Sequence, residues 1–99
     1  KDTNLITYEL YKEGFSIEEI AVKRNLKSTT IFSHLAKLYG DGKDIHIYNF
    51  VNKEEVESVR KAKLELENPP ALKPYFEHLN GELEYFKIRL ALSIIEKED

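Results

Sequence analysis

The sequence predicts an all-α fold in which a helix-turn-helix is followed by a small helical bundle, with five or six helices in total. Three observations support this prediction. Apolar residues recur at three- and four-residue spacings, which places them on one face of a helix. The helix-starting pattern Ser/Asn-x-x-Glu occurs at Ser16 and again at Asn52. Only residues 44–51, "DIHIYNFV", have the β-branched and aromatic content of a strand, and one strand cannot form a sheet.

Residues 1–42 are expected to form the helix-turn-helix core. The first helix should cover residues 3–13, and Gly14 should end it in a left-handed conformation. The second should start at Ser16, whose side chain pairs with Glu19, and run for about two turns. The expected core residues of these two helices are Leu5, Ile6, Leu10, Ile17, Ile20 and Ala21.

A tight turn into the third helix is expected at Asn25, because Asn tolerates a positive φ angle. Leu26 should fill this turn, and Ser28 should cap a helix over residues 28–39 that Gly40 and Gly42 end. At 100° per residue, the core side of this helix carries Ile31, Leu35 and Leu38. The outer side carries Thr29, Ser33 and Ala36, with Thr30 and Lys37 on its flank.

The second half is expected to begin with an extended connector at 43–52, laid across the helices, and to continue with C-terminal helices in 53–99. Asn52 should cap a helix that ends near residue 67, and "NPPA" should break the chain after it. Two more helices are expected at 72–79 and 82–97, separated by a turn at Asn80-Gly81. We expect residues 1–99 to form a single domain. Because the chain starts at Lys1 rather than Met, we expect it to be part of a longer protein.

The distribution of charge favours a local contact with a polyanion. The formal net charge of −3 argues mildly against nucleic-acid binding. However, the acidic excess lies wholly in residues 51–99, which hold eight basic and eleven acidic side chains. Between Glu19 and Asp41 there is no acidic residue, and the chain carries Lys23, Arg24, Lys27 and Lys37 there. A positive patch of this kind is typical of phosphate contact.

The outer side of the third helix is small and hydrogen-bonding, so it could approach a major groove closely. The candidate DNA-binding residues are Lys23, Lys27, Ser28, Thr29, Thr30, Ser33 and Lys37. The lysines would neutralise phosphates while the hydroxyl groups approach the groove. The alternative is an ordinary solvated helix face and a corner that serves packing alone, since no Arg lies on this helix to read guanine.

Residues 7–51, "TYELYKEGFSIEEIAVKRNLKSTTIFSHLAKLYGDGKDIHIYNFV", resemble the helix-turn-helix domain at the C-terminus of RecQ-like and Pif-type helicases. The matching residues are Thr7, Tyr8, Gly14, Ser16, Ile20, Ala21, Arg24, Leu26, Ser28, Ile31, His34 and Leu35. The later "LKPYFEHLNGELEYFKIRLAL" resembles that family's C-terminal helices. The resemblance implies a non-catalytic accessory domain that contacts DNA and works with the rest of a parent ATP-dependent helicase.

No catalytic or metal-binding pattern is present, so we expect neither an enzyme activity in this domain nor a cofactor. There is no Cys and no phosphate-binding G-x-x-x-x-G-K-S/T loop, and His34, His46 and His78 lack a metal-ligand spacing. We expect His34 to be a half-buried packing residue that donates a hydrogen bond. No apolar run approaches the roughly 18 residues of a membrane span. These features predict a cytoplasmic protein without a membrane partner.

The predicted last helix is apolar on two faces. One stripe comprises Leu83, Phe86, Leu90 and Ile94, and the other comprises Tyr85, Ile88, Leu92 and Ile95. Such a helix is either central in its own fold or covered by a partner. The second stripe therefore supports an alternative function, a protein-interaction or dimerisation module that packs on a second copy or on the rest of the parent protein.

Overall fold

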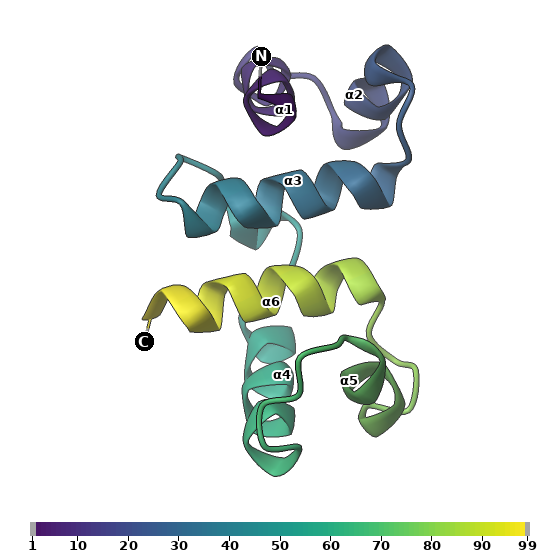
Figure 1. Ribbon diagram of the computed structural model, residues 1–99, viewed down its shortest axis with the longest axis vertical. Coiled ribbons are helices and arrows are strands. Elements are labelled where there is room, and N and C mark those ends of the chain that lie inside the picture. Colours follow the sequence, from purple (N-terminus) through teal and green to yellow (C-terminus); the bar gives the residue numbers. More distant parts are fainter. Residues whose placement is uncertain (1, 99) are drawn as a thin grey trace. The chain divides into compact units, whose positions relative to one another are not determined.

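A computed structural model describes residues 2–98, and within this range the chain forms six α-helices, one 3₁₀ helix and no strand (Figure 1). The prediction of an all-α fold is confirmed. The chain divides into two compact units, an N-terminal unit that ends at Ile45 and a C-terminal unit that begins at His46. The boundary lies inside the predicted connector at 43–52. That residues 1–99 act as one domain stays a prediction.

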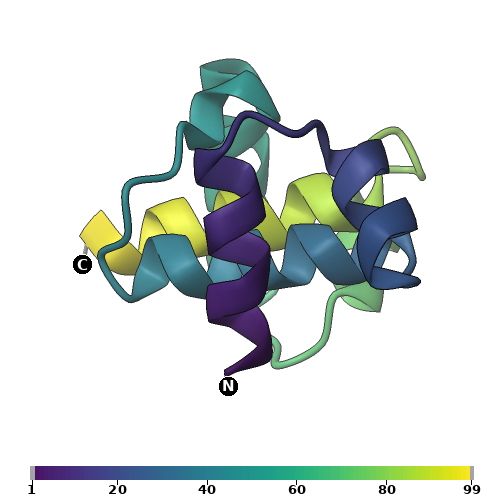
Figure 2. The same cartoon turned by 90° about the horizontal axis from the view of Figure 1, so that it is seen from above.

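The N-terminal unit holds three helices, α1 (Thr3–Lys12), α2 (Ile17–Arg24) and α3 (Ser28–Gly40). The third packs against both of the others, and Figure 2 shows α1 crossing over α3. The most buried aliphatic side chains are Ile20, Ile31 and Leu35, each 0% exposed. Because burying such a side chain is worth about 1.5–3 kcal/mol, this small core holds α3 against α2.

Local signals in the sequence form the helix ends as expected. The Ser16 hydroxyl accepts the Glu19 N–H at 3.1 Å, and the Glu19 carboxylate accepts the Ser16 N–H at 2.8 Å. Gly14 has a φ angle of 97°, and Asn25 has one of 55°. The predicted helix end, capping box and turn of the helix-turn-helix are all confirmed.

Two expectations for the N-terminal unit are wrong. Leu5 is 38% exposed, whereas Thr7 is 0% exposed because its hydroxyl meets polar partners from α2 and α3. Ser28 does not cap α3. Lys27 occupies the N-cap position with an extended backbone and no side-chain hydrogen bond, so Ser28 becomes the first helical residue.

The C-terminal unit begins with the 3₁₀ helix η1 (Ile47–Asn49) and continues with α4 (Lys53–Glu65), α5 (Lys73–His78) and α6 (Tyr85–Glu98). In this unit α6 packs against both α4 and α5. The buried side chains of α4 and the first stripe of α6 include Val56, Val59, Ala62, Leu90 and Ile94, none more than 2% exposed. The predicted apolar stripe of α4 is therefore core.

Glu55 connects the start of α4 to α6. Its Oε1 accepts the Asn52 N–H at 2.9 Å, while the Asn52 side chain accepts the Glu55 N–H at 2.7 Å. Its other oxygen, Oε2, accepts the Lys87 ammonium of α6 at 2.9 Å. Burial acts to raise the pKa of Glu55, but the hydrogen bonds from Lys87 and Asn52 outweigh it and the pKa is lowered. The predicted cap of α4 is confirmed, and it also holds a tertiary contact.

Three expectations for the C-terminal unit need correction. The predicted extended connector contains the one-turn helix η1, which buries Ile47. Helix α4 ends at Glu65 rather than near 67, because residues 67 and 68 take positive φ angles of 60° and 55° ahead of the two prolines. Helix α6 starts at Tyr85 rather than at 82, since the chain first brings Leu83 into the core after the Asn80-Gly81 turn.

Candidate nucleic-acid interface

The outer side of α3 stays open over much of its length. Thr29 and Lys37 are exposed, and Thr30 and Ser33 are half-buried. Ala36 is only 5% exposed, so its predicted place on the outer side is wrong. The predicted core side chains Ile31, Leu35 and Leu38 are at most 2% exposed. We call Thr29, Thr30, Ser33 and Lys37 the outer face of α3.

The start of α3 lies at the turn that follows α2. The first backbone hydrogen bonds of the helix run from the Thr30 and Ile31 N–H groups to the Lys27 carbonyl, at 3.0 and 3.2 Å. The N–H groups of Ser28 and Thr29 lie before the first of these bonds, in the turn where a helix leaves its N–H groups without a partner inside the helix. No side chain at the N-cap position accepts from them. A hollow of about 580 Å³ lies at this corner, and Lys27 and Ser28 are among the residues that line it. The backbone N–H donors and the positive end of the helix dipole at the start of α3 are suited to binding a phosphate.

The three candidate lysines differ in their surroundings. Lys27 is exposed beside the helix start. The Lys23 ammonium lies 4.4 Å from the centre of the Phe15 ring. The Lys37 ammonium lies 3.4 Å from the Asp41 carboxylate, with 65% of the Lys37 side chain exposed. An exposed pair of this kind is weak, so a phosphate can replace Asp41.

Acidic groups also lie near this surface. Glu18 lines the same corner as Lys27 and would repel a phosphate placed there. The Glu19 carboxylate is fixed at the start of α2, because it accepts the Ser16 backbone N–H. Lys27 offsets Glu18 at this corner, and α3 itself carries no acidic residue. Phosphate contact along α3 is therefore favoured over contact with the start of α2, where Glu18 and Glu19 lie.

Arg24 belongs to the predicted positive patch but serves the fold. One nitrogen of its guanidinium donates to the Thr3 carbonyl at 2.7 Å and to the Thr7 hydroxyl at 2.6 Å. The other donates to the Thr3 hydroxyl at 2.8 Å. These bonds tie α2 to α1, so Arg24 is not placed to serve as a phosphate ligand. The sequence offered no signal for this role, because the partners lie 17 and 21 residues away.

Two of the four residues of the predicted interface stripe on α6 are buried in the chain. Ile88 is 0% exposed and Ile95 is 3% exposed, while Leu92 is half-buried. Tyr85 is 41% exposed, and its ring stacks on Phe76 with centroids 4.6 Å apart. These positions favour a central helix over a helix with one face left open for a partner.

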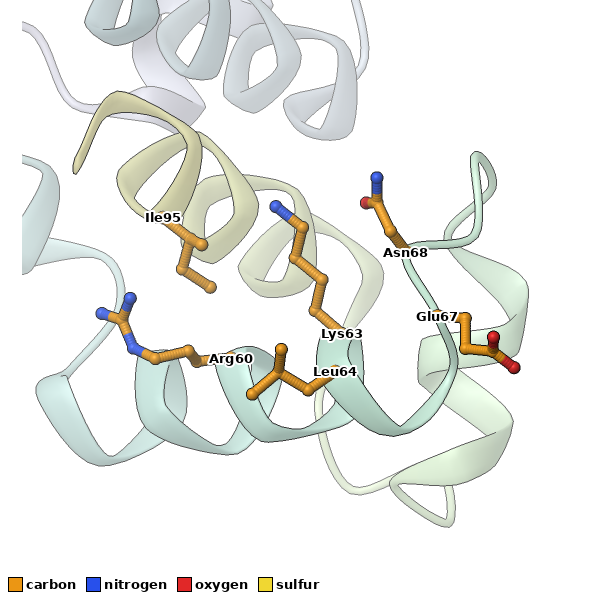
Figure 3. Close-up of a pocket in the computed structure, with 6 residues that line it drawn as sticks. All are labelled: Arg60, Lys63, Leu64, Glu67, Asn68 and Ile95. Carbon is orange, nitrogen blue, oxygen red and sulfur yellow. The ribbon is translucent and has the colours of Figure 1, made fainter. Parts of the chain in front are cut away.

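The C-terminal unit has a cavity of about 410 Å³ beside α4 and α6. Its lining residues are Arg60, Lys63, Leu64, Glu67, Asn68 and Ile95. Figure 3 shows Lys63 and Leu64 reaching from α4 toward Ile95 of α6. Leu64 is 78% exposed, whereas the Arg60 guanidinium is already bound to Glu57 at 3.0 Å and to Glu98 at 2.8 Å. The exposed Leu64 therefore makes this cavity better suited to an apolar contact than to binding an anion through Arg60.

Titratable side chains form no metal centre in the described range. Among residues 2–98 no three His, Cys, Asp or Glu side chains are grouped to hold an ion. His78 Nε2 lies 2.8 Å from the Glu65 carboxylate, and His34 Nδ1 lies 2.8 Å from the Thr7 hydroxyl. Over the same residues, no helix has the length and apolar character needed to cross a membrane.

The fold and the outer face of α3 define a helix-turn-helix protein. A family described as the helix-turn-helix domain matches residues 3–92, so the chain belongs to this family. The match extends from α1 into α6 and includes residues of both units. Comparison with curated proteins and with solved structures gave no match. Membership of this family points to DNA as a partner.

Proposed function

We propose that this chain is a DNA-binding accessory domain and that the outer face of α3 makes the contact. The observation that supports the proposal is that Thr29 and Lys37 are exposed at the two ends of that face, with half-buried Thr30 and Ser33 between them. Small hydroxyl side chains let a helix lie close to the groove, and Lys23, Lys27 and Lys37 would hold phosphates. Ser28 would add its backbone N–H at the helix start.

We further propose that the parent protein is a helicase and that this domain supplies DNA contact while the ATP-dependent motor lies elsewhere in it. The support is the resemblance carried by residues such as Thr7, Arg24 and His34, which meet in one cluster. The absence of Cys is in keeping with a cytoplasmic protein. Sequencing the gene upstream of Lys1 tests this context, because a nucleotide-binding motor should be encoded there.

The binding should be weak and salt-dependent. Three lysine–phosphate contacts give an expected slope of about −3 for log K against log[salt] on duplex DNA. Fluorescence anisotropy with labelled duplex and forked DNA, at two or more salt concentrations, measures this slope. No binding to either DNA at low salt would refute the proposed function.

A second candidate function, a homodimer formed through the C-terminal unit, is favoured by Leu64, which is 78% exposed beside an apolar cavity that includes Ile95. If it forms, light scattering should give a dimer mass that Leu64→Glu reduces to a monomer. Val22→Glu, at an 82% exposed apolar residue of the N-terminal unit, is the matched control and should leave the mass unchanged. A monomer at every concentration of the unaltered chain would exclude this candidate.

A further inference from the structure

Polar side chains from all three helices of the N-terminal unit meet at one point. Thr7 of α1 is 0% exposed, and its hydroxyl lies 2.6 Å from the Arg24 guanidinium of α2 and 2.8 Å from His34 Nδ1 of α3. Arg24 also donates to the Thr3 carbonyl and hydroxyl. The helix that carries the candidate DNA-binding face is thus joined to the rest of the unit through His34.

The Thr7 hydroxyl connects the Arg24 guanidinium to the His34 imidazole. An arginine can only donate, so the Thr7 hydroxyl accepts from Arg24 and keeps its own proton to donate. His34 Nδ1 is the other partner that the structure gives this hydroxyl. The hydroxyl oxygen has a second lone pair, so Nδ1 either accepts the Thr7 proton or, in the other tautomer, donates its own proton to this oxygen. The donor role expected for His34 therefore stays a prediction.

Protonation of His34 would disturb the cluster in two ways. It would leave Nδ1 able only to donate to the Thr7 hydroxyl, which already accepts from Arg24, and it would place a second positive charge beside Arg24. Burial of the ring and the nearby Arg24 both lower the pKa of His34, and Asp2 opposes them with a smaller effect. The neutral imidazole is therefore the form that suits the folded unit.

We propose that Thr7, Arg24 and His34 form a pH-sensitive clamp, which holds α1 and α2 against α3 while His34 is neutral and loosens when His34 gains a proton. The clamp is a property of the N-terminal unit and does not depend on DNA. Loosening at acidic pH would move the outer face of α3 and so change the affinity for DNA. This consequence rests on the proposed function.

The sign of the effect on folding follows from proton linkage. Because the folded-state pKa of His34 lies below its ordinary value of 6.5, the unfolded chain takes up a proton first as the pH falls. The stability that the clamp provides is fully present above about pH 6.5 and is lost as the pH falls below it. The unfolding equilibrium constant should rise by up to about tenfold per pH unit in that window.

Two measurements on the 99-residue chain without DNA test the clamp. An NMR titration of the histidine rings should place the pKa of His34 below 6.5, and Arg24→Gln should raise it. Urea unfolding at about pH 7.5 and about pH 5.5 should show a loss of stability that His34→Asn removes. His78→Asn, in the C-terminal unit, is the matched control and should retain the loss.

The proposal is overturned if His34 titrates at or above 6.5 in the folded chain. It is also overturned if His34→Asn keeps the full pH dependence of the unaltered protein. The NMR titration of the unaltered chain decides the question even if a variant fails to fold. Since neither measurement involves DNA, failure of the clamp and failure of the proposed function can be told apart.

Discussion

The double variant Lys27→Glu/Lys37→Glu is expected to bind duplex DNA roughly 50- to 100-fold more weakly than the unaltered chain at about 0.1 M salt. Each phosphate contact contributes about 0.9 to the salt slope, so two contacts account for roughly 1.8 logarithmic units of affinity at that concentration. The slope of log K against log[salt] should become shallower, from about −3 to about −1. Anisotropy titrations at several salt concentrations measure both quantities.

A matched control distinguishes the loss of a specific contact from the effect of a changed net charge. Lys53→Glu/Lys61→Glu makes the same charge change at two exposed lysines of α4 in the C-terminal unit, and it should leave most of the affinity intact. Asp41→Asn should act in the opposite direction, because it frees the Lys37 ammonium, 3.4 Å away, for a phosphate. Equal losses in the two double variants would show that α3 is not the contact surface.

Leu35→Ala is expected to destabilise the N-terminal unit by about 2–5 kcal/mol. Leu35 is 0% exposed on the core side of α3, so the substitution leaves a cavity that the packed helices cannot fully close. Urea unfolding followed by far-UV circular dichroism measures the loss. A loss of this size is a large part of the stability of a small domain.

Val22→Ala provides the comparison for this prediction. Val22 lies on α2 and is 82% exposed, so removing its methyl groups should change the stability by no more than about 0.5 kcal/mol. If Leu35→Ala and Val22→Ala had the same effect, Leu35 could not occupy the core between the helices.

Features encoded within a few residues could be predicted from the sequence. The Ser16 and Asn52 caps depend on a partner three positions away, and the turn at Asn25 depends on the conformational freedom of one side chain. The core side of α3 followed from helical spacing alone, as the burial of Leu35 shows. These local signals are enough to predict the helix-turn-helix without knowledge of any tertiary contact.

Features that depend on distant partners could not be predicted in this way. The sequence pattern groups Arg24 with the surface cations, yet its partners are residues of α1 that no spacing rule connects to it. A regular helical step places Ala36 on the outer side, but its burial depends on tertiary packing. The polar residue Thr7 is buried because two other helices supply its hydrogen bonds.

The shared carboxylate of Glu55 has a consequence for how the C-terminal unit opens. One oxygen closes the first turn of α4, and the other holds Lys87 of α6, so the first turn cannot unwind without also releasing an inter-helix tether. The end of a helix normally frays independently of its neighbours. Here the backbone amides near Glu55 should exchange with solvent in step with those around Lys87, as parts of one cooperative opening event.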